Sequence, residues 1–211
     1  MTDTKTKLLD GTLRTLTEHG IAGTSARTIA AAAGVNQALV FYHYGSVDEL
    51  LAAACRHGAE QRVALYRDRL AHVQNLSELL ALARELHTEE KAQGHLNVLG
   101  QLLAGAQTQP RLAGATVAGL SLWTEELEQV LARVMAESPL AEFIDTTGLA
   151  KAMSAGFVGL ELYEGVDPEG SERALAALED IAALVSVLDD MGPILQRAAR
   201  SHLRRKRKPT A

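Results

Sequence analysis

Apolar residues recur at helical spacing along most of the chain, whereas runs that alternate with the period of two typical of strands are almost absent. The first predicted helix covers residues 4–19, carries Leu8, Leu9, Leu13 and Leu16 on one face, and ends at Gly20. Further helices are predicted from Ser46 and near residues 77–92, 95–108, 113–137, 146–163, 170–189 and 191–207. Ala, Leu, Glu, Arg and Gln, which favour helices, dominate the composition. The pattern therefore predicts an all-α protein of about ten helices.

Two short helices are predicted between Ser25 and Gly45. Ser25 is a suitable N-cap for a helix over residues 26–33, and Gly34 follows where a helix end needs a left-handed backbone. Asn36 would cap a second helix over about residues 37–44. Apolar side chains are expected to lock the two helices together from inside: Ile29, Val35 and Val40. This is the pattern of a helix-turn-helix, whose second helix can enter the major groove of DNA.

The charge is distributed unevenly along the 211 residues, although the net value is only −5. Residues 1–50 hold four basic and five acidic side chains, and residues 191–211 hold seven basic and none acidic, which leaves a net −11 between them. The basic tail is expected either to be a disordered solubilising segment or to attract DNA without sequence preference. With one cysteine, a polar N-terminus and no apolar run of about 18 residues, a cytoplasmic protein that makes no membrane contact is expected.

The block GIAGTSARTIAAAAGVNQALVFYHYGSVDELL resembles the DNA-binding domain of TetR-family (tetracycline-repressor-like) transcriptional regulators. The resemblance covers about residues 5–55 and rests on the glycine-rich entry, the A-G-V turn and the aromatic residues that close the second helix. It implies an N-terminal three-helix helix-turn-helix DNA-binding domain over residues 1–45. A helical effector-binding and dimerisation domain with a basic C-terminal tail would then occupy residues 46–211.

The resemblance assigns DNA contacts to residues at and around the second short helix. Arg27 would read a base edge, and Gln37 and Ala38 would face bases. Tyr42 and His43 would grip phosphates or the groove edge, and Ser25 would donate to a phosphate while it caps its helix. Tyr44 is expected in the core instead. Relatives usually have Tyr at the position of Phe41 and Lys at that of Val47, so two phosphate contacts are missing. The expected DNA-binding residues are Ser25, Arg27, Asn36, Gln37, Ala38, Phe41, Tyr42 and His43.

The resemblance also implies a homodimer and a small-molecule effector. The interface is expected from two late helices, residues 146–163 and 171–188, which carry apolar residues at helical spacing. The effector pocket would be mostly apolar with a few polar groups, which suits a mostly apolar ligand. The expected ligand-binding residues are His87, Asn97, Leu99, Gln101, Leu102, Leu120 and Trp123.

Motifs typical of enzymes are missing from the sequence: no glycine-rich phosphate loop, HExxH or nucleophile elbow occurs. His87 and Glu90 lie three apart, with His95 nearby, but a solvated helix face explains them better than a metal or acid–base site. We therefore expect a regulator with no enzymatic activity and no cofactor, a repressor released from a palindromic double-stranded operator by its effector. The alternative is a helical interaction module or an architectural DNA-binding module without an effector.

Overall fold

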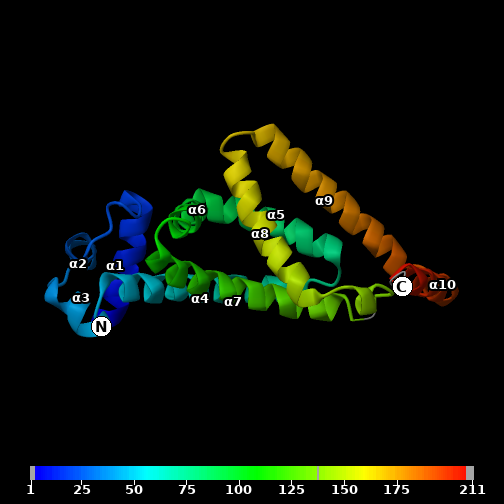
Figure 1. Ribbon diagram of the computed structural model, residues 1–211, viewed down its shortest axis with the longest axis horizontal. Coiled ribbons are helices and arrows are strands. Elements are labelled where there is room, and N and C mark those ends of the chain that lie inside the picture. Colours follow the sequence, from blue (N-terminus) through cyan, green and yellow to red (C-terminus); the bar gives the residue numbers. More distant parts are fainter. Residues whose placement is uncertain (1–2, 137, 208–211) are drawn as a thin grey trace. The chain divides into compact units, whose positions relative to one another are not determined.

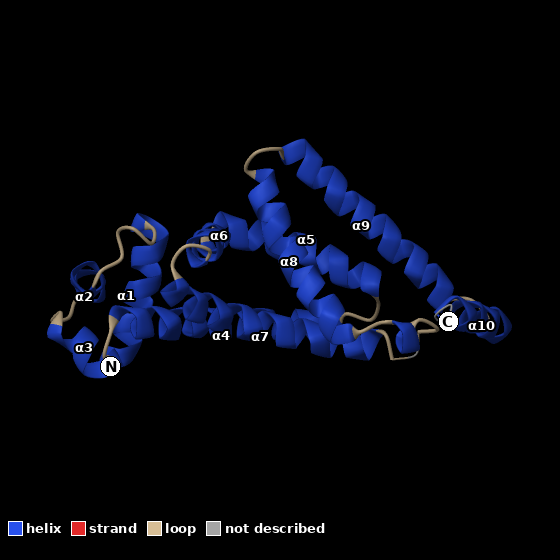
Figure 2. Ribbon diagram, viewed as in Figure 1, coloured by secondary structure: helices blue, strands red, loops and turns tan. Residues whose placement is uncertain are grey.

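The computed structural model describes residues 3–136 and 138–207, and this part of the chain consists of helices joined by turns and loops, without strands (Figures 1 and 2). This confirms the predicted all-α fold. No described helix is both long enough and apolar enough to span a membrane. The helices are α1 (Thr4–His19), α2 (Ala26–Ala33), α3 (Ala38–Tyr44), α4 (Val47–His72), α5 (Leu76–Ala92), α6 (His95–Ala106), α7 (Pro110–Val134), the 3-10 helix η1 (Ala141–Phe143), α8 (Thr146–Glu164), α9 (Pro168–Asp189) and α10 (Pro193–Arg207).

Three helix boundaries differ from the prediction because prolines open helices in this chain. Pro110, Pro168 and Pro193 are the first residues of α7, α9 and α10. Proline is favoured there since its missing N–H would have no partner within the helix in any case. The predicted starts at residues 113, 170 and 191 were therefore wrong by two or three positions. The predicted end of α7 at residue 137, a position outside the described residues, was wrong too, since this helix ends at Val134.

The chain forms two compact units. The first unit comprises Met1–Tyr66 and Thr88–Thr124, and the second comprises Arg67–His87 and Glu125–Ala211. Helices α4, α5 and α7 contribute residues to both units, so the units are not consecutive in sequence. The predicted division into residues 1–45 and 46–211 stays a prediction about function.

The core of the first unit begins under the helix-turn-helix. Leu8, Ile29, Val40 and Leu50, from α1 to α4, are fully buried and belong to one apolar cluster, with Val35 packed against it. The predicted lock between the two short helices is thus confirmed. On α1, Gly11 lies so close to α2 that an added Cβ would come within 2.8 Å of the Cβ of Ala33. A larger residue at Gly11 would push the two helices apart.

A second cluster in the same unit joins α1 to the later helices. It contains Leu16 of α1, Leu51 of α4, Leu102 of α6, and Leu112 and Ala115 of α7. Cys55 packs against this cluster, and burial raises the pKa of its thiol to about 11. The thiol is therefore protonated at neutral pH, as is typical of a buried structural cysteine.

The second unit contains α8 and α9, which form an antiparallel pair (Figure 1). Ala150 and Ala182 are fully buried, and the Ser171 hydroxyl donates to the Leu160 carbonyl at 3.1 Å. Arg84 of α5 donates to carboxylates on α9: to Glu179 through Nε at 2.8 Å and Nη2 at 3.0 Å, and to Glu172 through Nη1 at 2.6 Å. These hydrogen bonds fix α5 against α9.

Candidate nucleic-acid interface and ligand-binding residues

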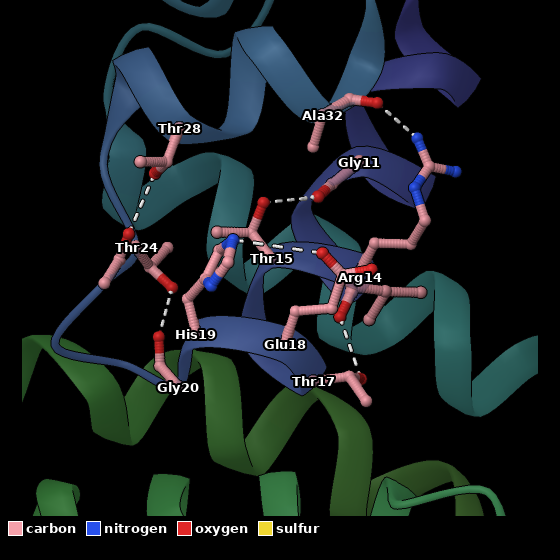
Figure 3. A network of polar contacts seen from close by, with 12 residues as sticks. Gly11, Arg14, Thr15, Thr17, Glu18, His19, Gly20, Thr24, Thr28 and Ala32 are labelled. Atoms are coloured by element: carbon pink, nitrogen blue, oxygen red, sulfur yellow. Dashed lines mark hydrogen bonds and ion pairs between the residues drawn. The ribbon is translucent and has the colours of Figure 1, made fainter.

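The turn before α2 is held by hydrogen bonds from side chains close in sequence. The Ser25 hydroxyl accepts from the Thr28 backbone N–H at 3.2 Å, and the Thr28 hydroxyl accepts from the Ser25 backbone N–H at 2.9 Å. This reciprocal capping box confirms Ser25 as the N-cap of α2. Figure 3 shows the surrounding network, in which Thr24 donates to the Gly20 carbonyl at 2.8 Å. Local bonds thus fix where α2 begins.

The turn between α2 and α3 has the expected left-handed glycine. Gly34 has φ 65° and ψ 37°, and the Val35 N–H donates back to the Ala30 carbonyl at 3.0 Å. Asn36 accepts from the Ala38 backbone N–H at 2.8 Å through its side chain. Helix α3 therefore begins at Ala38, one residue later than predicted, because the Asn36 side chain bonds to a position only two residues on, as in an Asx turn.

Helix α3 has one buried side and one exposed side. Val40 is fully buried, whereas Phe41 is 50 % and Tyr42 80 % exposed. Gln37 and Ala38 are exposed too, one turn earlier on the same side. Aromatic side chains that are exposed together on one side of a helix are typical of an interaction surface. This side of α3 is therefore a surface ready for a partner.

The other predicted DNA-binding residues lie next to this surface. Ser25 and Arg27 are exposed at the start of α2. His43 is half-buried, and its ring meets that of Tyr42 edge-on at 4.9 Å. Tyr44 packs against the core and its hydroxyl donates to the Lys5 carbonyl at 3.2 Å, so the expected core position is confirmed. The DNA contacts themselves stay predictions.

One arginine of the N-terminal region, Arg14, makes a hydrogen bond within the protein. The Arg14 guanidinium on α1 donates to the Ala32 carbonyl near the end of α2 (Figure 3). Sequence reasoning missed this bond, since nothing local pairs residues 14 and 32. Arg14 thus holds α1 to α2, and its charge is partly neutralised by the C-terminal end of that helix.

The predicted ligand-binding residues divide between the two units. His87 belongs to the second unit and the other six belong to the first. Leu102 is buried in the apolar cluster, and Asn97 is exposed. The exposed Gln101 accepts a long hydrogen bond, 3.4 Å, from the Ile21 N–H. The half-buried members are Leu99, Leu120 and Trp123.

A buried polar cluster in the first unit was not predicted. Glu90 is only 5 % exposed and accepts from Tyr66 Oη at 2.6 Å, while its other oxygen lies 2.9 Å from His95 Nδ1. Nη1 of Arg62 lies 3.4 Å from Oε1 of Glu90. The centroid of the Tyr66 ring lies 6.1 Å from that of the Trp123 ring. The expectation that Glu90 lies on a solvated face was therefore wrong, and its partner is His95 and not His87.

This environment shifts the pKa values of both hydrogen-bonded groups. Burial acts to raise the pKa of Glu90, but the bonds from His95 and Tyr66 and the charge of Arg62 outweigh it, so the pKa falls below its ordinary value. Burial, followed by the bond to Glu90, raises the pKa of Tyr66. Glu90 is thus a carboxylate at neutral pH, and the protonated Tyr66 hydroxyl donates a hydrogen bond to it.

The second unit exposes apolar side chains on both α8 and α9. Small residues Gly156 and Gly159 on α8 face open space within the chain. Ala182, which the sequence placed in the dimer interface, is buried inside the unit, so that part of the prediction was wrong. The exposed apolar residues, called here the α8–α9 face, are Leu162, Tyr163, Val166, Leu178, Ile181, Leu184 and Val187.

Comparison with known proteins connects these features. Residues 8–54 match the family described as bacterial regulatory proteins, tetR family. No match was found among curated proteins. Among solved structures, a protein from Rhodococcus sp. described as a TetR-family transcriptional regulator is similar, with 21 % identity, a TM-score of 0.69, and coverage of 88 % of this chain and 99 % of that one.

Two further structures extend the likeness. SCO7518 from Streptomyces coelicolor A3(2), described as a transcriptional regulator, is 26 % identical with a TM-score of 0.65, over 85 % of this chain and 98 % of that one. The multidrug binding protein EbrR, solved with proflavin, is 25 % identical with a TM-score of 0.58, over 83 % and 99 %. The capped helix-turn-helix and the match over residues 8–54 show an N-terminal DNA-binding domain of the tetR family, and the all-helical remainder is similar in fold to these solved regulators.

Proposed function

We propose that this regulator is a repressor that binds a palindromic operator as a homodimer and releases it when a small, mostly apolar effector binds. The observation that carries the proposal is the exposed side of α3, where Phe41 and Tyr42 project from a helix whose other side is fully buried at Val40. A helix held in this way can enter the major groove as a rigid element.

The side chains on this surface are chemically suited to two kinds of DNA contact, to bases and to phosphates. Gln37 stands at the start of α3 and carries an amide that can pair with adenine, and Arg27 on α2 carries a guanidinium that suits guanine. Tyr42 and Ser25 offer hydroxyl groups for phosphate oxygens. Phe41 lacks the hydroxyl that relatives have at this position, so it would contact the sugar or a thymine methyl group.

The α8–α9 face supports the homodimer. Its exposed apolar side chains lie on two neighbouring helices and in the turn between them, and Gly156 and Gly159 allow another helix to approach closely. A contiguous apolar surface on a monomer marks an interaction site. A symmetric pair of chains would present two α3 helices to two half-sites, about 34–36 Å apart along the duplex.

The environment of Trp123 supports an effector site in the first unit. Trp123 and Tyr66 form an aromatic pair next to the carboxylate of Glu90, and Arg62 and His95 add hydrogen-bonding groups. EbrR is a multidrug binding protein with structures in complex with proflavin and ethidium. By analogy, a panel for this chain includes planar cationic dyes beside neutral apolar compounds. Quenching of Trp123 fluorescence and a raised Tm are the expected results.

Two structural links within the first unit offer a route from effector to DNA. Helix α4 begins directly after α3, and α6 contacts the end of α1 through Leu102 and through the Gln101–Ile21 bond. An effector that binds a conformation with displaced α4 or α6 more tightly would weaken DNA binding, with a typical coupling of about 1–3 kcal/mol.

A gel-shift assay with DNA from either side of this protein's own gene tests the proposal. Retention of one fragment against excess random competitor DNA is expected, followed by release with an effector found by the Trp123 screen. Uniform retention of every fragment would favour the architectural module, and no retention would favour the protein-interaction module. A cytoplasmic location stays a prediction that accompanies this function.

A further inference from the structure

A histidine and two glutamates from different helices meet inside the second unit. Nε2 of His87 on α5 lies 2.8 Å from Oε2 of Glu164 and 3.4 Å from Oε2 of Glu161, both on α8. The candidate ligand atoms of all three residues lie within 4.8 Å of one another. Phe157 meets the His87 ring edge-on at 5.4 Å. Since Phe157, Glu161 and Glu164 are spaced i, i+4, i+7, one face of α8 both orients the imidazole and supplies both carboxylates.

Glu161 has a buried oxygen atom that no hydrogen-bond donor of the described chain satisfies. Only 9 % of its side chain is exposed, and its Oε2 is buried without a hydrogen-bond partner in the described part of the chain. Leaving a buried acceptor unsatisfied costs about 1–3 kcal/mol, and more when the group is charged. His87 Nε2 can hold a single proton, for which Glu164 is the nearer acceptor. The imidazole therefore cannot satisfy both carboxylates.

We propose that His87, Glu161 and Glu164 bind one divalent first-row transition-metal ion of the Zn²⁺ type. Two carboxylates and a neutral imidazole carry a formal charge of −2, which a divalent cation neutralises. Tetrahedral coordination at about 2.1 Å puts ligand atoms about 3.4 Å apart, so the His87–Glu161 pair needs little adjustment and the His87–Glu164 pair must open slightly. Three protein ligands leave a fourth position for water or a small ligand.

The imidazole sets the class of metal. Imidazole nitrogen suits Zn²⁺, Ni²⁺ and Cu²⁺, whereas Mg²⁺ and Ca²⁺ prefer sites made of oxygen ligands alone. Weak or undetectable binding of Mg²⁺ is therefore expected at concentrations where Zn²⁺ saturates the protein.

The first unit contains a matched control pair. His95 contacts Glu90 at 2.9 Å, much as His87 contacts Glu164. There, however, Tyr66 donates to the carboxylate and the Arg62 guanidinium lies 3.4 Å from it, so the acceptor is satisfied and a cation would be repelled. Removing His95 should leave metal binding intact.

The test is calorimetric titration of the untagged, chelator-treated full chain with ZnCl₂, without DNA, so that its outcome is independent of the proposed repressor function. One ion per chain is expected, with an increase in Tm. His87→Gln and Glu161→Gln should each weaken binding about 100-fold or more, and His95→Gln should leave it unchanged. Absence of Zn²⁺ binding in the wild type, or equal binding in all variants, would overturn the proposal.

A second measurement needs no variant. Diethylpyrocarbonate modifies accessible imidazoles, and mass spectrometry identifies the modified residue. Zn²⁺ should protect His87 from modification and leave the reactivity of His95 unchanged. Equal modification of His87 with and without a saturating concentration of Zn²⁺ would contradict the site even if the Gln variants failed to fold.

Discussion

The helix-turn-helix segment and the second unit are held together by different kinds of contact. Around α2 and α3, contacts between residues two to five apart fix each turn, as in the capping box of Ser25 and Thr28. In the second unit, contacts join residues far apart in sequence, such as Arg84 with Glu179 and His87 with Glu164. In the helix-turn-helix segment the turns are held by their own hydrogen bonds, and the exposed side of α3 is the surface left for a partner. The second unit leaves an apolar face exposed and a buried carboxylate oxygen without a hydrogen-bond partner in the described chain.

This difference indicates which region is expected to bind DNA and which is expected to bind other partners. A segment fixed by its own turns can be presented to DNA without reorganising, because its backbone conformation does not depend on the contact. Surfaces built from distant residues can be adjusted through helix movement. The proposed DNA contacts therefore belong to the locally fixed helix-turn-helix segment, whereas the proposed dimer interface and metal site belong to the second unit.

The largest expected effect comes from charging the α8–α9 face. Ile181→Glu combined with Leu184→Glu should convert the dimer into a monomer, since each carboxylate would be buried unpaired in the interface. Operator affinity should then fall by more than about 100-fold, because the two half-sites are no longer bound together. Light scattering at micromolar concentration and a gel-shift assay check this. With Asp180→Ala as the control, a double variant that stays dimeric would show that the interface lies elsewhere.

Removing one hydroxyl tests the buried polar cluster. Tyr66→Phe should lower the free energy of unfolding by about 1.5–3 kcal/mol at pH 7, because the Glu90 carboxylate loses a charge-assisted hydrogen bond. The Glu90 pKa lies below its ordinary value in the folded state, so this stabilisation is present above the unfolded pKa and fades as pH falls through the folded one. The loss measured by urea unfolding should accordingly shrink towards pH 3. A pH-independent loss would assign the effect to packing.

A methyl group tests how tightly α1 and α2 are packed. Gly11→Ala should lower the free energy of unfolding by about 1–3 kcal/mol, since the new Cβ would lie within 3 Å of the Ala33 backbone nitrogen and Cβ. Gly114→Ala is the matched control, because Gly114 is helical and faces open space. There the higher helix propensity of Ala should stabilise the protein by up to about 1 kcal/mol. Equal effects at both sites would refute the tight packing.

The smallest expected effect concerns the basic C-terminus. Helix α10 extends to Arg207, so the described part of this tail is helical, whereas Lys208 lies outside the described residues. Four arginines and a serine line one depression on it: Arg197, Arg200, Ser201, Arg204 and Arg205. If this face attracts DNA, deletion from Leu203 onward should flatten the dependence of log affinity on log salt by about one unit or more.

A gain-of-charge variant gives the opposite change. Val47→Lys restores the cation that relatives carry at the start of α4 and should steepen the same slope by about one unit, on every DNA sequence alike. An unchanged slope after the truncation would mean that the tail does not touch DNA and serves solubility instead.

The sequence predicted the helix-turn-helix well because its determinants are local. Ser25 and Gly34 act within a few residues of themselves, so their residue types carry the information. The buried position of Val40 followed from its apolar side chain, whereas the residues on the exposed side of α3 were assigned by the family resemblance. Within this region the start of α3 was missed by one residue, where the Asn36 side chain replaced a helix cap with a tighter turn.

The clusters of charged residues could not be predicted, because helix spacing does not say which helix faces which. Glu161 and Glu164 share a face by their spacing, but nothing in the sequence pairs them with His87. The same limit led to the wrong prediction of a solvated position for Glu90, which is buried and contacts His95 across the turn between α5 and α6. Helix faces are local properties, whereas their partners depend on the tertiary fold.

The most direct test measures DNA affinity after Gln37→Ala, on the operator and on random DNA in parallel. The account predicts a loss of about 1–3 kcal/mol on the operator and almost none on random DNA, because an amide at the start of α3 would read a base and not the backbone. Gln61→Ala on α4 is the control and should change neither affinity. An equal loss on both DNAs, or none on either, would contradict the claim that the exposed side of α3 reads the operator.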